Sequence, residues 1–483
     1  MKLDKNNFLT PKYILPFLLV LIFGFFVFFG RNQNKNYLAF HGPHIGSELA
    51  EVVQSENPDV ELAAAGRFKK ERRRRSPRNG KQTPPVVVPP STPVAIPTPT
   101  PVTSPTPVPK PIPVPITTIS PTVTTQTATT VLNTTTTQAI TANASQPIIN
   151  YNGFGIAAGG GLIGLSQNDL NNYFASLKTL GVTWVRWDID WSTVQTRDVN
   201  TYDWINIDRV ANTAKTYGIK SLGIITYAPD WAEISGCGVG QYCPPKDPNT
   251  FATFAGVTAN RYKGIVNAWE IWNEENTPNF WSPSPNSQQY GELLKLSYIA
   301  IKKVDPTILV LSGGLAAAGD EGGNISPITF IKALYTSDVH NYFDAVALHP
   351  YTYPVDSEYI ASWNSWQQMY LVRGLMVSNN ESNKKIWVTE FGAPTNGPGT
   401  ERSLNELDFS YGSDYMSEKA QQTLVERASS LYSADKSWMG PFFWYSLRDN
   451  DVSKTTPENF FGIIRYDGTF KPSYTSFKNL ISQ

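Results

Sequence analysis

The chain is poor in the residues that build metal clusters and is balanced in charge. It has two cysteines and four histidines among 483 residues, and two of those histidines lie in the first 150. The two cysteines and two histidines that remain cannot form a Cys/His zinc cluster of ordinary spacing. Its 40 basic and 40 acidic residues cancel, so it has no basic excess for binding nucleic acid. We therefore exclude both classes.

Charge and aromatic residues are unevenly distributed along the chain. Residues 1–150 carry 15 Lys+Arg and 7 Asp+Glu, whereas residues 151–483 carry 25 and 33. All 13 tryptophans lie between Trp184 and Trp444, and residues 84–115 contain 14 prolines. A segment so rich in proline cannot bury a core. The packed globule is therefore predicted to be acidic and to span residues 150–483.

The chain has one long hydrophobic run, residues 13–29 (YILPFLLVLIFGFFVFF). At about 1.5 Å per residue it is just long enough to cross the hydrocarbon core of a bilayer. Lys2, Lys5 and Lys12 precede it, and no clear cleavage site of small residues follows. This pattern predicts a single-pass anchor in the cell membrane, with residues 1–12 in the cytoplasm. A cleaved signal peptide is the alternative.

Two segments that cannot form a core separate this run from the globule. Residues 30–80 are charged and are predicted to be disordered; they include the basic run 69–78, which lies on the outer side in this orientation. Residues 81–149 are rich in Pro and Thr, a composition that favours polyproline II helix. At about 3.1 Å per residue this segment could reach roughly 200 Å. It is therefore predicted to be a stalk that holds the globule away from the membrane.

Within the globule, eight short apolar runs alternate with longer segments of helical periodicity. The runs are 154–158, 183–188, 220–227, 266–273, 308–313, 345–349, 385–390 and 441–446. They start about 30 to 56 residues apart, which leaves room for a helix and two loops between strands. Ser166 and Asp169 form a capping pattern at the first helix. The sequence therefore predicts an α/β fold, a (β/α)8 TIM barrel. A doubly wound open sheet is the rival.

The glycine run after the first strand favours that rival. Residues 159–164 (GGGLIG) match G-x-G-x-x-G, and Asp188 follows at the end of the second strand. This spacing is typical of dinucleotide-binding folds, which need the last glycine inside the helix. Here the capping residue Ser166 starts the helix beyond the whole run. We therefore interpret the run as a glycine-rich loop and predict no cofactor.

Two of the predicted strands end on glutamate. Glu274 closes WEIWNE after the fourth strand, and Glu390 ends the seventh in IWVTEFG. In (β/α)8 barrels the chemistry lies where the strands end at their carboxyl side. A pair of carboxyl groups flanking a sugar is what glycoside hydrolysis requires, without metal or cofactor. Glu270 and Glu275 are rival acids.

These motifs resemble the retaining (β/α)8 glycoside hydrolases of the clan that contains families 5 and 39. The preceding Cys243-Pro-Pro-Lys-Asp247-Pro, Phe251, Phe254 and Arg261-Tyr262 make the chain most like bacterial family 39. The resemblance implies that Glu274 is the general acid/base, Glu390 the nucleophile and Asn273 the ligand of the sugar 2-hydroxyl. The family commonly has Pro after the Asn-Glu pair, where this chain has Glu275, an extra carboxylate that could be a salt-bridge partner or a substrate contact.

The two roles also follow from electrostatics. Two carboxyl groups about 5 Å apart do not both ionise easily, so one proton is expected on the member in less polar surroundings. We predict that this is Glu274, which is flanked by Trp272 and Asn273. Glu390 would then attack the anomeric carbon and the configuration would be retained. An inverting mechanism needs a wider gap of about 6.5–9.5 Å.

Other strand ends supply substrate-binding candidates. Arg186 could hold the nucleophile ionised, or could belong to a buried ion pair of the barrel. His349 and Tyr351 resemble the histidine and tyrosine that line the sugar site in this clan; a core histidine and a packing tyrosine are the alternative.

Three tryptophans are further candidates for sugar binding. Trp444, at the end of the eighth strand, is predicted to be a platform under the sugar ring, with core packing as the alternative. Trp231 and Trp281 are either further subsites or packing residues of the rim. Asp188, Asp449 and Asp451 are interpreted as solvated loop charges.

Cys237 and Cys243 are six residues apart in the third loop. Outside the cytoplasm this spacing permits a disulfide that closes a small loop. Two free thiols are the alternative.

Taken together, these features predict a membrane-anchored, extracellular, retaining glycoside hydrolase that cleaves poly- or oligosaccharides. No protein partner is predicted. The alternatives are a surface carbohydrate-binding protein with an inactive barrel, and a transglycosylase that passes the same intermediate to a sugar.

Overall fold

The computed structural model describes residues 152–236 and 242–482. The predicted anchor (13–29), the charged segment and the stalk lie outside these residues, as does Cys237. Among the helices that are described, none combines the length and the apolar character needed to cross a bilayer.

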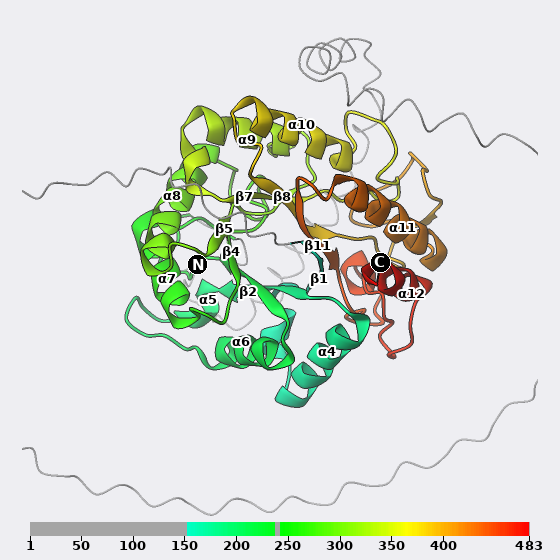
Figure 1. Cartoon of the computed structure of the whole chain (residues 1–483), viewed down its shortest axis with the longest axis horizontal. Coiled ribbons are helices and arrows are strands. Elements are labelled where there is room, and N and C mark those ends of the chain that lie inside the picture. The colour runs from blue at the N-terminus through cyan, green and yellow to red at the C-terminus, as the bar shows by residue number, and fades with distance from the viewer. Residues whose placement is uncertain (1–151, 237–241, 483) are drawn as a thin grey trace, which may run out of the picture. The chain divides into compact units, whose positions relative to one another are not determined.

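Eight parallel strands form a closed barrel. They are β1 (Phe154–Ala157), β2 (Trp184–Asp190), β3 (Lys220–Thr226), β4 (Ala268–Ile271), β5 (Leu309–Leu311), β7 (Ala345–His349), β8 (Lys385–Phe391) and β11 (Met439–Tyr445). Neighbours in the chain are neighbours in the sheet, β1 pairs with β11, and the pairing of β5 with β7 closes the ring. Figure 1 looks into this ring, with the helices around it. The predicted TIM barrel is confirmed, and the doubly wound sheet is wrong.

All eight predicted strands are present, with shifted ends. β4 and β5 are shorter than predicted, and β11 begins two residues earlier. The short β6 (Leu315–Ala316) pairs with β7, and β9 (Glu401–Arg402) pairs with β10 (Tyr415–Met416) outside the barrel.

Helices follow the strands as the periodicity predicts. The α-helices are α4 (Gln167–Leu180), α5 (Trp191–Val194), α6 (Ile205–Tyr217), α7 (Pro248–Arg261), α8 (Ser287–Val304), α9 (Pro327–Thr336), α10 (Ser365–Ser378), α11 (Glu418–Asp435) and α12 (Pro472–Ile481). The 3-10 helices in the described part of the chain are η2 (Gly159–Gly164), η3 (Val339–Tyr342) and η4 (Pro457–Phe460). Ser166 caps α4 by accepting from the Asp169 amide, so the glycine run lies wholly before the helix. This geometry differs from the dinucleotide motif.

The inside of the barrel is filled by a small core to which all eight barrel strands contribute. Its members are Ala157, Trp184, Leu222, Ala268, Leu311, Ala345, Ala347, Trp387 and Phe443. Trp184 and Trp387 meet edge to face, with ring centroids 5.4 Å apart. The barrel is therefore a packed core, and only its mouth is free for chemistry.

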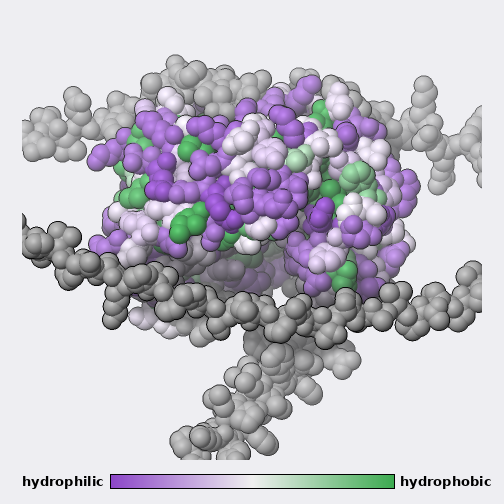
Figure 2. Space-filling view, turned by 90° about the horizontal axis from the view of Figure 1, so that it is seen from below, coloured by the Kyte–Doolittle hydropathy of each residue, from purple (hydrophilic) through white to green (hydrophobic). Residues whose placement is uncertain are grey.

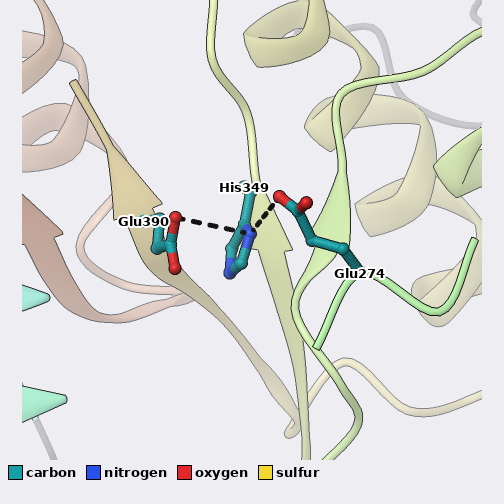
Figure 3. Close-up of side chains that lie close together, drawn as sticks. All are labelled: Glu274, His349 and Glu390. Carbon is teal, nitrogen blue, oxygen red and sulfur yellow. Dashed lines mark hydrogen bonds and ion pairs between the residues drawn. The ribbon is translucent and has the colours of Figure 1, made fainter. Parts of the chain in front are cut away.

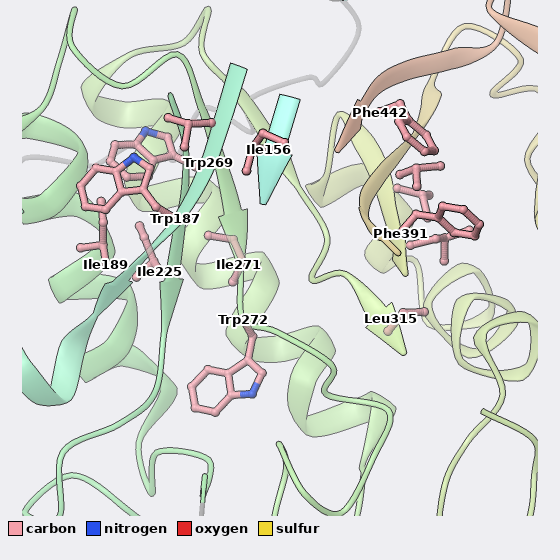
Figure 4. Packing of buried hydrophobic residues seen from close by; sticks show 14 of the residues in the cluster. Ile156, Trp187, Ile189, Ile225, Trp269, Ile271, Trp272, Leu315, Phe391 and Phe442 are labelled. Atoms are coloured by element: carbon pink, nitrogen blue, oxygen red, sulfur yellow. The ribbon is translucent and has the colours of Figure 1, made fainter. Parts of the chain in front are cut away.

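A larger core lies between the strands and the helices. Alternate residues along each strand point outward into it; Figure 4 shows Trp187 and Ile189 of β2, Ile225 of β3 and Ile271 of β4. The surface over the helices in Figure 2 is mainly hydrophilic, with scattered hydrophobic residues. The two cores thus account for the apolar pattern of the strands.

Candidate active site

The two glutamates lie at the mouth of the barrel on β8 and just beyond β4. Glu390 is the second-last residue of β8. After β4 the backbone is left-handed at Trp272 (φ 71°) and at Glu274 (φ 53°). Residues other than Gly and Asn rarely adopt this backbone conformation. The Glu274 amide is held by the Gly314 carbonyl at 3.0 Å. Such local strain typically costs about 1–3 kcal/mol per residue and occurs at functional sites.

His349 lies between the two carboxyl groups (Figure 3). Its Nδ1 is 2.9 Å from Glu274 Oε1 and 3.8 Å from Glu390 Oε2. One oxygen of each glutamate and a ring nitrogen of His349 all lie within 4.8 Å of one another. The histidine is fully buried, whereas the side chains of Glu274 and Glu390 are 18% and 14% exposed. The structure thus brings the two predicted glutamates together at a place that solvent can reach.

Glu390 is surrounded by groups that stabilise its charged form. Arg186 Nη1 forms an ion pair with Oε1, and the Tyr351 hydroxyl donates to Oε2 at 2.7 Å. Burial alone would raise the pKa of Glu390. The charges of His349 and Arg186 and the hydrogen bonds from Tyr351 and Arg186 outweigh burial, so the pKa lies below its ordinary value. Glu390 is therefore a carboxylate at neutral pH.

Arg186, fully buried on β2, connects three strands of the barrel. It forms two hydrogen bonds of 2.8 Å with Glu270 on β4, in addition to its ion pair with Glu390 on β8. Its Nη2 also donates to Asn273 Oδ1 at 2.8 Å, and Asn273 Nδ2 donates to the Tyr227 hydroxyl at 3.3 Å. Both predicted roles of Arg186 thus coexist. Glu270 is a structural ion-pair partner, and sequence reasoning missed this pairing.

Two glycines after β5 make room for the buried acid and the histidine. A Cβ on Gly314 would lie 2.2 Å from His349 Nε2, and one on Gly313 would lie 2.1 Å from Glu275 Oε2. Glu275 itself is fully buried, and burial raises its pKa well above the ordinary value. Burial therefore favours the protonated form of Glu275, which lies beside Tyr290. It is neither the salt-bridge partner nor the substrate contact considered from the sequence.

Trp444 is not at the mouth. It is fully buried in the outer core, where its ring contacts Phe391 and Phe477. Successive strand residues point to opposite faces, so Phe443 and Tyr445 point into the barrel instead. Tyr445 is half-buried at the strand end, and its hydroxyl donates to Glu458 at 3.3 Å. Trp444 therefore has no face free for a sugar, and the prediction of a platform there is wrong; the aromatic side chain at this strand end that solvent reaches is Tyr445, one residue further on.

The other two tryptophans serve mainly as packing residues. Trp281 is 1% exposed and packs between Trp272 and Tyr290, so it presents no face to a sugar. Trp231 is half-buried; its indole nitrogen donates to the Gln195 carbonyl at 2.6 Å, and its ring contacts Trp191. The predicted disulfide between Cys237 and Cys243 stays a prediction, because Cys237 lies outside the described residues.

Three further acids near strand ends have distinct environments. Asp449 is buried and forms an ion pair of 2.7 Å with Lys471, so it is not a solvated loop charge. Asp451 is exposed, as predicted. Burial, followed by the charge of Glu390, raises the pKa of Glu458 to about 7. Nothing in the sequence marks Glu458, because it lies well after β11, in η4.

Glu274, His349 and Glu390 are also the one group in the described part of the chain whose donor atoms are close enough to hold a metal ion. Two carboxyl groups at this separation can carry out glycoside hydrolysis without a metal ion, because one protonates the leaving oxygen and the other attacks the anomeric carbon. The arrangement therefore supports acid/base and nucleophilic chemistry at a sugar.

Comparisons with known proteins agree with this interpretation of the site. No family model matches the chain. Part of it is 30% identical, over 132 residues, to a curated beta-xylosidase of Geobacillus stearothermophilus; this match covers 25% of the chain and 26% of that protein. The chain thus spans about a quarter of the length of its curated relative.

Solved structures resemble the barrel. A family 39 glycoside hydrolase from Bacteroides cellulosilyticus has a TM-score of 0.53 at 22% identity, over 70% of this chain and 64% of that one. A monomeric beta-xylosidase from Caulobacter crescentus has a TM-score of 0.52 at 18% identity, over 70% and 69%. A family 39 enzyme from Xanthomonas axonopodis has a TM-score of 0.52 at 15% identity, over 71% and 68%. The chain is therefore similar in fold to family 39 glycoside hydrolases, and part of its sequence is similar to a beta-xylosidase.

Proposed function

We propose that the chain is a retaining glycoside hydrolase in which Glu390 is the nucleophile and Glu274 the general acid/base. The observation that carries this proposal is the distance between the two carboxyl groups, an oxygen of one lying within 4.8 Å of an oxygen of the other. Retaining enzymes have carboxyl groups about 5–5.5 Å apart, whereas inverting enzymes need about 6.5–9.5 Å to admit a water molecule.

The environments of the two carboxyl groups support this assignment of roles. Glu390 receives donors from Arg186 and Tyr351, and these hold it ionised for attack on the anomeric carbon. Glu274 has His349 as its neighbour and is free of Arg186 in the described contacts. It protonates the departing oxygen and then, as a base, removes a proton from the water that releases the glycosyl-enzyme. Asn273, oriented by Arg186, binds the 2-hydroxyl.

The substrate in this proposal is an extracellular poly- or oligosaccharide. The curated relative is a beta-xylosidase, which makes β-xylosides the first compounds to test. The N-terminal run 13–29 and the Pro/Thr-rich segment support attachment to the cell membrane through a stalk. A carbohydrate-binding protein without turnover would use the same fold, and a transglycosylase would use the same intermediate.

The first test replaces the nucleophile. Glu390→Ala should lower kcat by roughly five orders of magnitude on aryl glycosides such as 4-nitrophenyl β-D-xylopyranoside, because no covalent intermediate can form. Azide should restore part of the activity and give a glycosyl azide of inverted configuration. Glu292→Ala, on the exposed side of α8, is the matched control and should behave like wild type. Full activity of Glu390→Ala would exclude this residue.

The second test separates the acid role. Glu274→Ala should reduce hydrolysis of glycosides with poor leaving groups, such as xylo-oligosaccharides, far more than hydrolysis of 2,4-dinitrophenyl glycosides, because a good leaving group needs no protonation. Rates on both substrates should be compared with those of Glu292→Ala. Equal losses on the two substrates would contradict the assignment. Binding of oligosaccharides without any product from wild type would favour the carbohydrate-binding alternative.

A further inference from the structure

One carboxyl group at the mouth of the barrel has no partner of its own. Asp188 lies on β2, two residues beyond Arg186 and on the same side of the strand, and it is half-buried. Within the described residues its carboxyl group makes no hydrogen bond and no ion pair closer than 4 Å. Its neighbour Asp190, by contrast, accepts from the Ser192 amide and hydroxyl at 2.8 and 2.7 Å.

The electrostatics place Asp188 near Arg186 and Glu390. Burial raises the pKa of Asp188 to about 7; the charge of Arg186 lowers it, and the charges of Glu390, Asp190 and Glu270 raise it further. In turn, Asp188 is one of the charges that raise the pKa of Tyr445, behind burial, Glu458 and Glu390. A half-buried carboxyl group without donors is unfavourable, and a ligand that supplies donors relieves this cost.

The glycine run borders this carboxyl group and leaves it accessible. A Cβ on Gly160 would lie 3.4 Å from Asp188 Oδ2, and Cβ atoms on Gly159, Gly161 and Gly164 would meet nothing within 4 Å. This part of η2 therefore presents backbone without side chains next to an unpaired acceptor. The glycine run 159–164 does not form a nucleotide-binding motif, and the roles of Glu274 and Glu390 do not require it, so it is still without a function.

We propose that Asp188 is a substrate-binding residue that accepts hydrogen bonds from ring hydroxyls of the sugar held at Glu274 and Glu390. The glycine run forms the side-chain-free wall on which that ring rests. This inference rests on the proposed function and extends it, because it assigns a specificity residue on β2. Its ligand is a neutral sugar hydroxyl, since a hydroxyl donates and the carboxylate group only accepts.

The test compares Asp188→Asn with Asp190→Asn, a control on the same strand in which asparagine can still cap α5. On 4-nitrophenyl β-D-xylopyranoside, or on whichever aryl glycoside of a panel wild type hydrolyses fastest, Asp188→Asn should lower kcat/KM about 10- to 100-fold. Asp190→Asn should stay near wild type. Unfolding midpoints of both variants should match wild type, which excludes a folding defect.

Deoxy substrates distinguish direct contact from a structural role. The 2-, 3- and 4-deoxy analogues are assayed with wild type and with Asp188→Asn. For the hydroxyl that Asp188 binds, the loss on removing the hydroxyl should be large in wild type and largely absent in the variant. Equal losses in both proteins for every analogue, or unchanged kcat/KM in Asp188→Asn, would overturn the inference and leave the proposed hydrolase intact.

A panel that wild type does not hydrolyse would instead contradict the proposed function. In that case titration calorimetry with xylo-oligosaccharides decides the inference, because a sugar contact affects binding without turnover. Weaker binding to Asp188→Asn than to Asp190→Asn would support the contact. Equal affinities, or binding to none of the proteins, would overturn it.

Discussion

Glu390 retains its charge because of neighbours from separate parts of the barrel. Arg186 comes from β2, His349 from β7, and Tyr351 from the loop that follows β7. Because the pKa of Glu390 is lowered, the carboxylate persists to a pH below its ordinary range and is lost as the pH falls through the lowered value. The acid limb of kcat/KM should therefore lie below the ordinary pKa of a glutamate.

Tyr351→Phe tests this account of the nucleophile. The substitution removes the donor 2.7 Å from Glu390 Oε2 and leaves the ring packing against Phe391 and Phe461. Loss of a donor to a carboxylate raises its pKa, so the acid limb of kcat/KM should move to higher pH, and the plateau should fall about tenfold. The profile is measured with an aryl glycoside between pH 3 and pH 9. An unshifted acid limb would show that Tyr351 does not tune Glu390.

At the level of single residues, the sequence predicted that Glu274 and Glu390 would meet and that Arg186, His349 and Tyr351 would lie beside them. It did not predict the other partners of Arg186 or the environment of Asp188. Glu274 and Glu390 could be found because both lie at or just beyond the ends of apolar runs, and parallel strand ends converge at one mouth of a barrel. The other partners of Arg186 could not be found, since Glu270 lies within a strand and its contact depends on strand register. Asp188 was interpreted as a solvated charge, because a sequence does not show whether a carboxyl group is half-buried and without a partner.

β11 shows how the alternation of side chains along a strand determines which residues reach the mouth of the barrel. The sequence placed a tryptophan at the strand end, which favoured Trp444 as the sugar platform. Which of two adjacent aromatic residues faces the mouth depends on where the alternation starts, and the start is known only once the strand is paired. The end of β4 was misplaced for a related reason: the apolar pattern continues past Ile271, but the backbone turns left-handed at Trp272 and Glu274 and leaves the strand.

Alanine substitutions of Trp444 and Tyr445 should affect different properties of the protein, stability in the first case and KM in the second. Trp444→Ala removes a fully buried ring and should lower the free energy of unfolding by about 3–5 kcal/mol, measured in urea. Tyr445→Ala removes a half-buried ring at the mouth, so it should raise KM by roughly 2- to 10-fold with a much smaller loss of stability. Should Trp444→Phe, a milder change, raise KM without destabilising the protein, the corrected assignment would be wrong.

The whole barrel is closed by contacts among the described residues. All eight strands between residues 154 and 445 contribute to the inner core, and α12 packs on α11 at the C-terminal end. Composition alone located this unit, since the tryptophans that fill it are absent from the first 150 residues. The predicted anchor and stalk lie outside the described residues and stay predictions.

A fragment of residues 150–483 should therefore fold on its own. We expect it to be soluble without detergent, to unfold cooperatively, and to have the same kcat/KM as the full chain in detergent, because every site residue lies within it. Circular dichroism and aryl glycoside assays on both proteins check this expectation. An insoluble or inactive fragment beside an active full chain would show that the N-terminal segments take part in folding or catalysis.

The bridging position of Arg186 has a consequence for how this protein can change. One buried guanidinium holds β2, β4 and β8 together and also sets the charge of the attacking group. Breaking such a pair by removing one partner costs about 3–5 kcal/mol, so a lineage that discarded the chemistry would still be selected to keep this arginine. A related protein that keeps Arg186 is therefore not necessarily an active enzyme. The presence of both Glu274 and Glu390 is the better indication of activity.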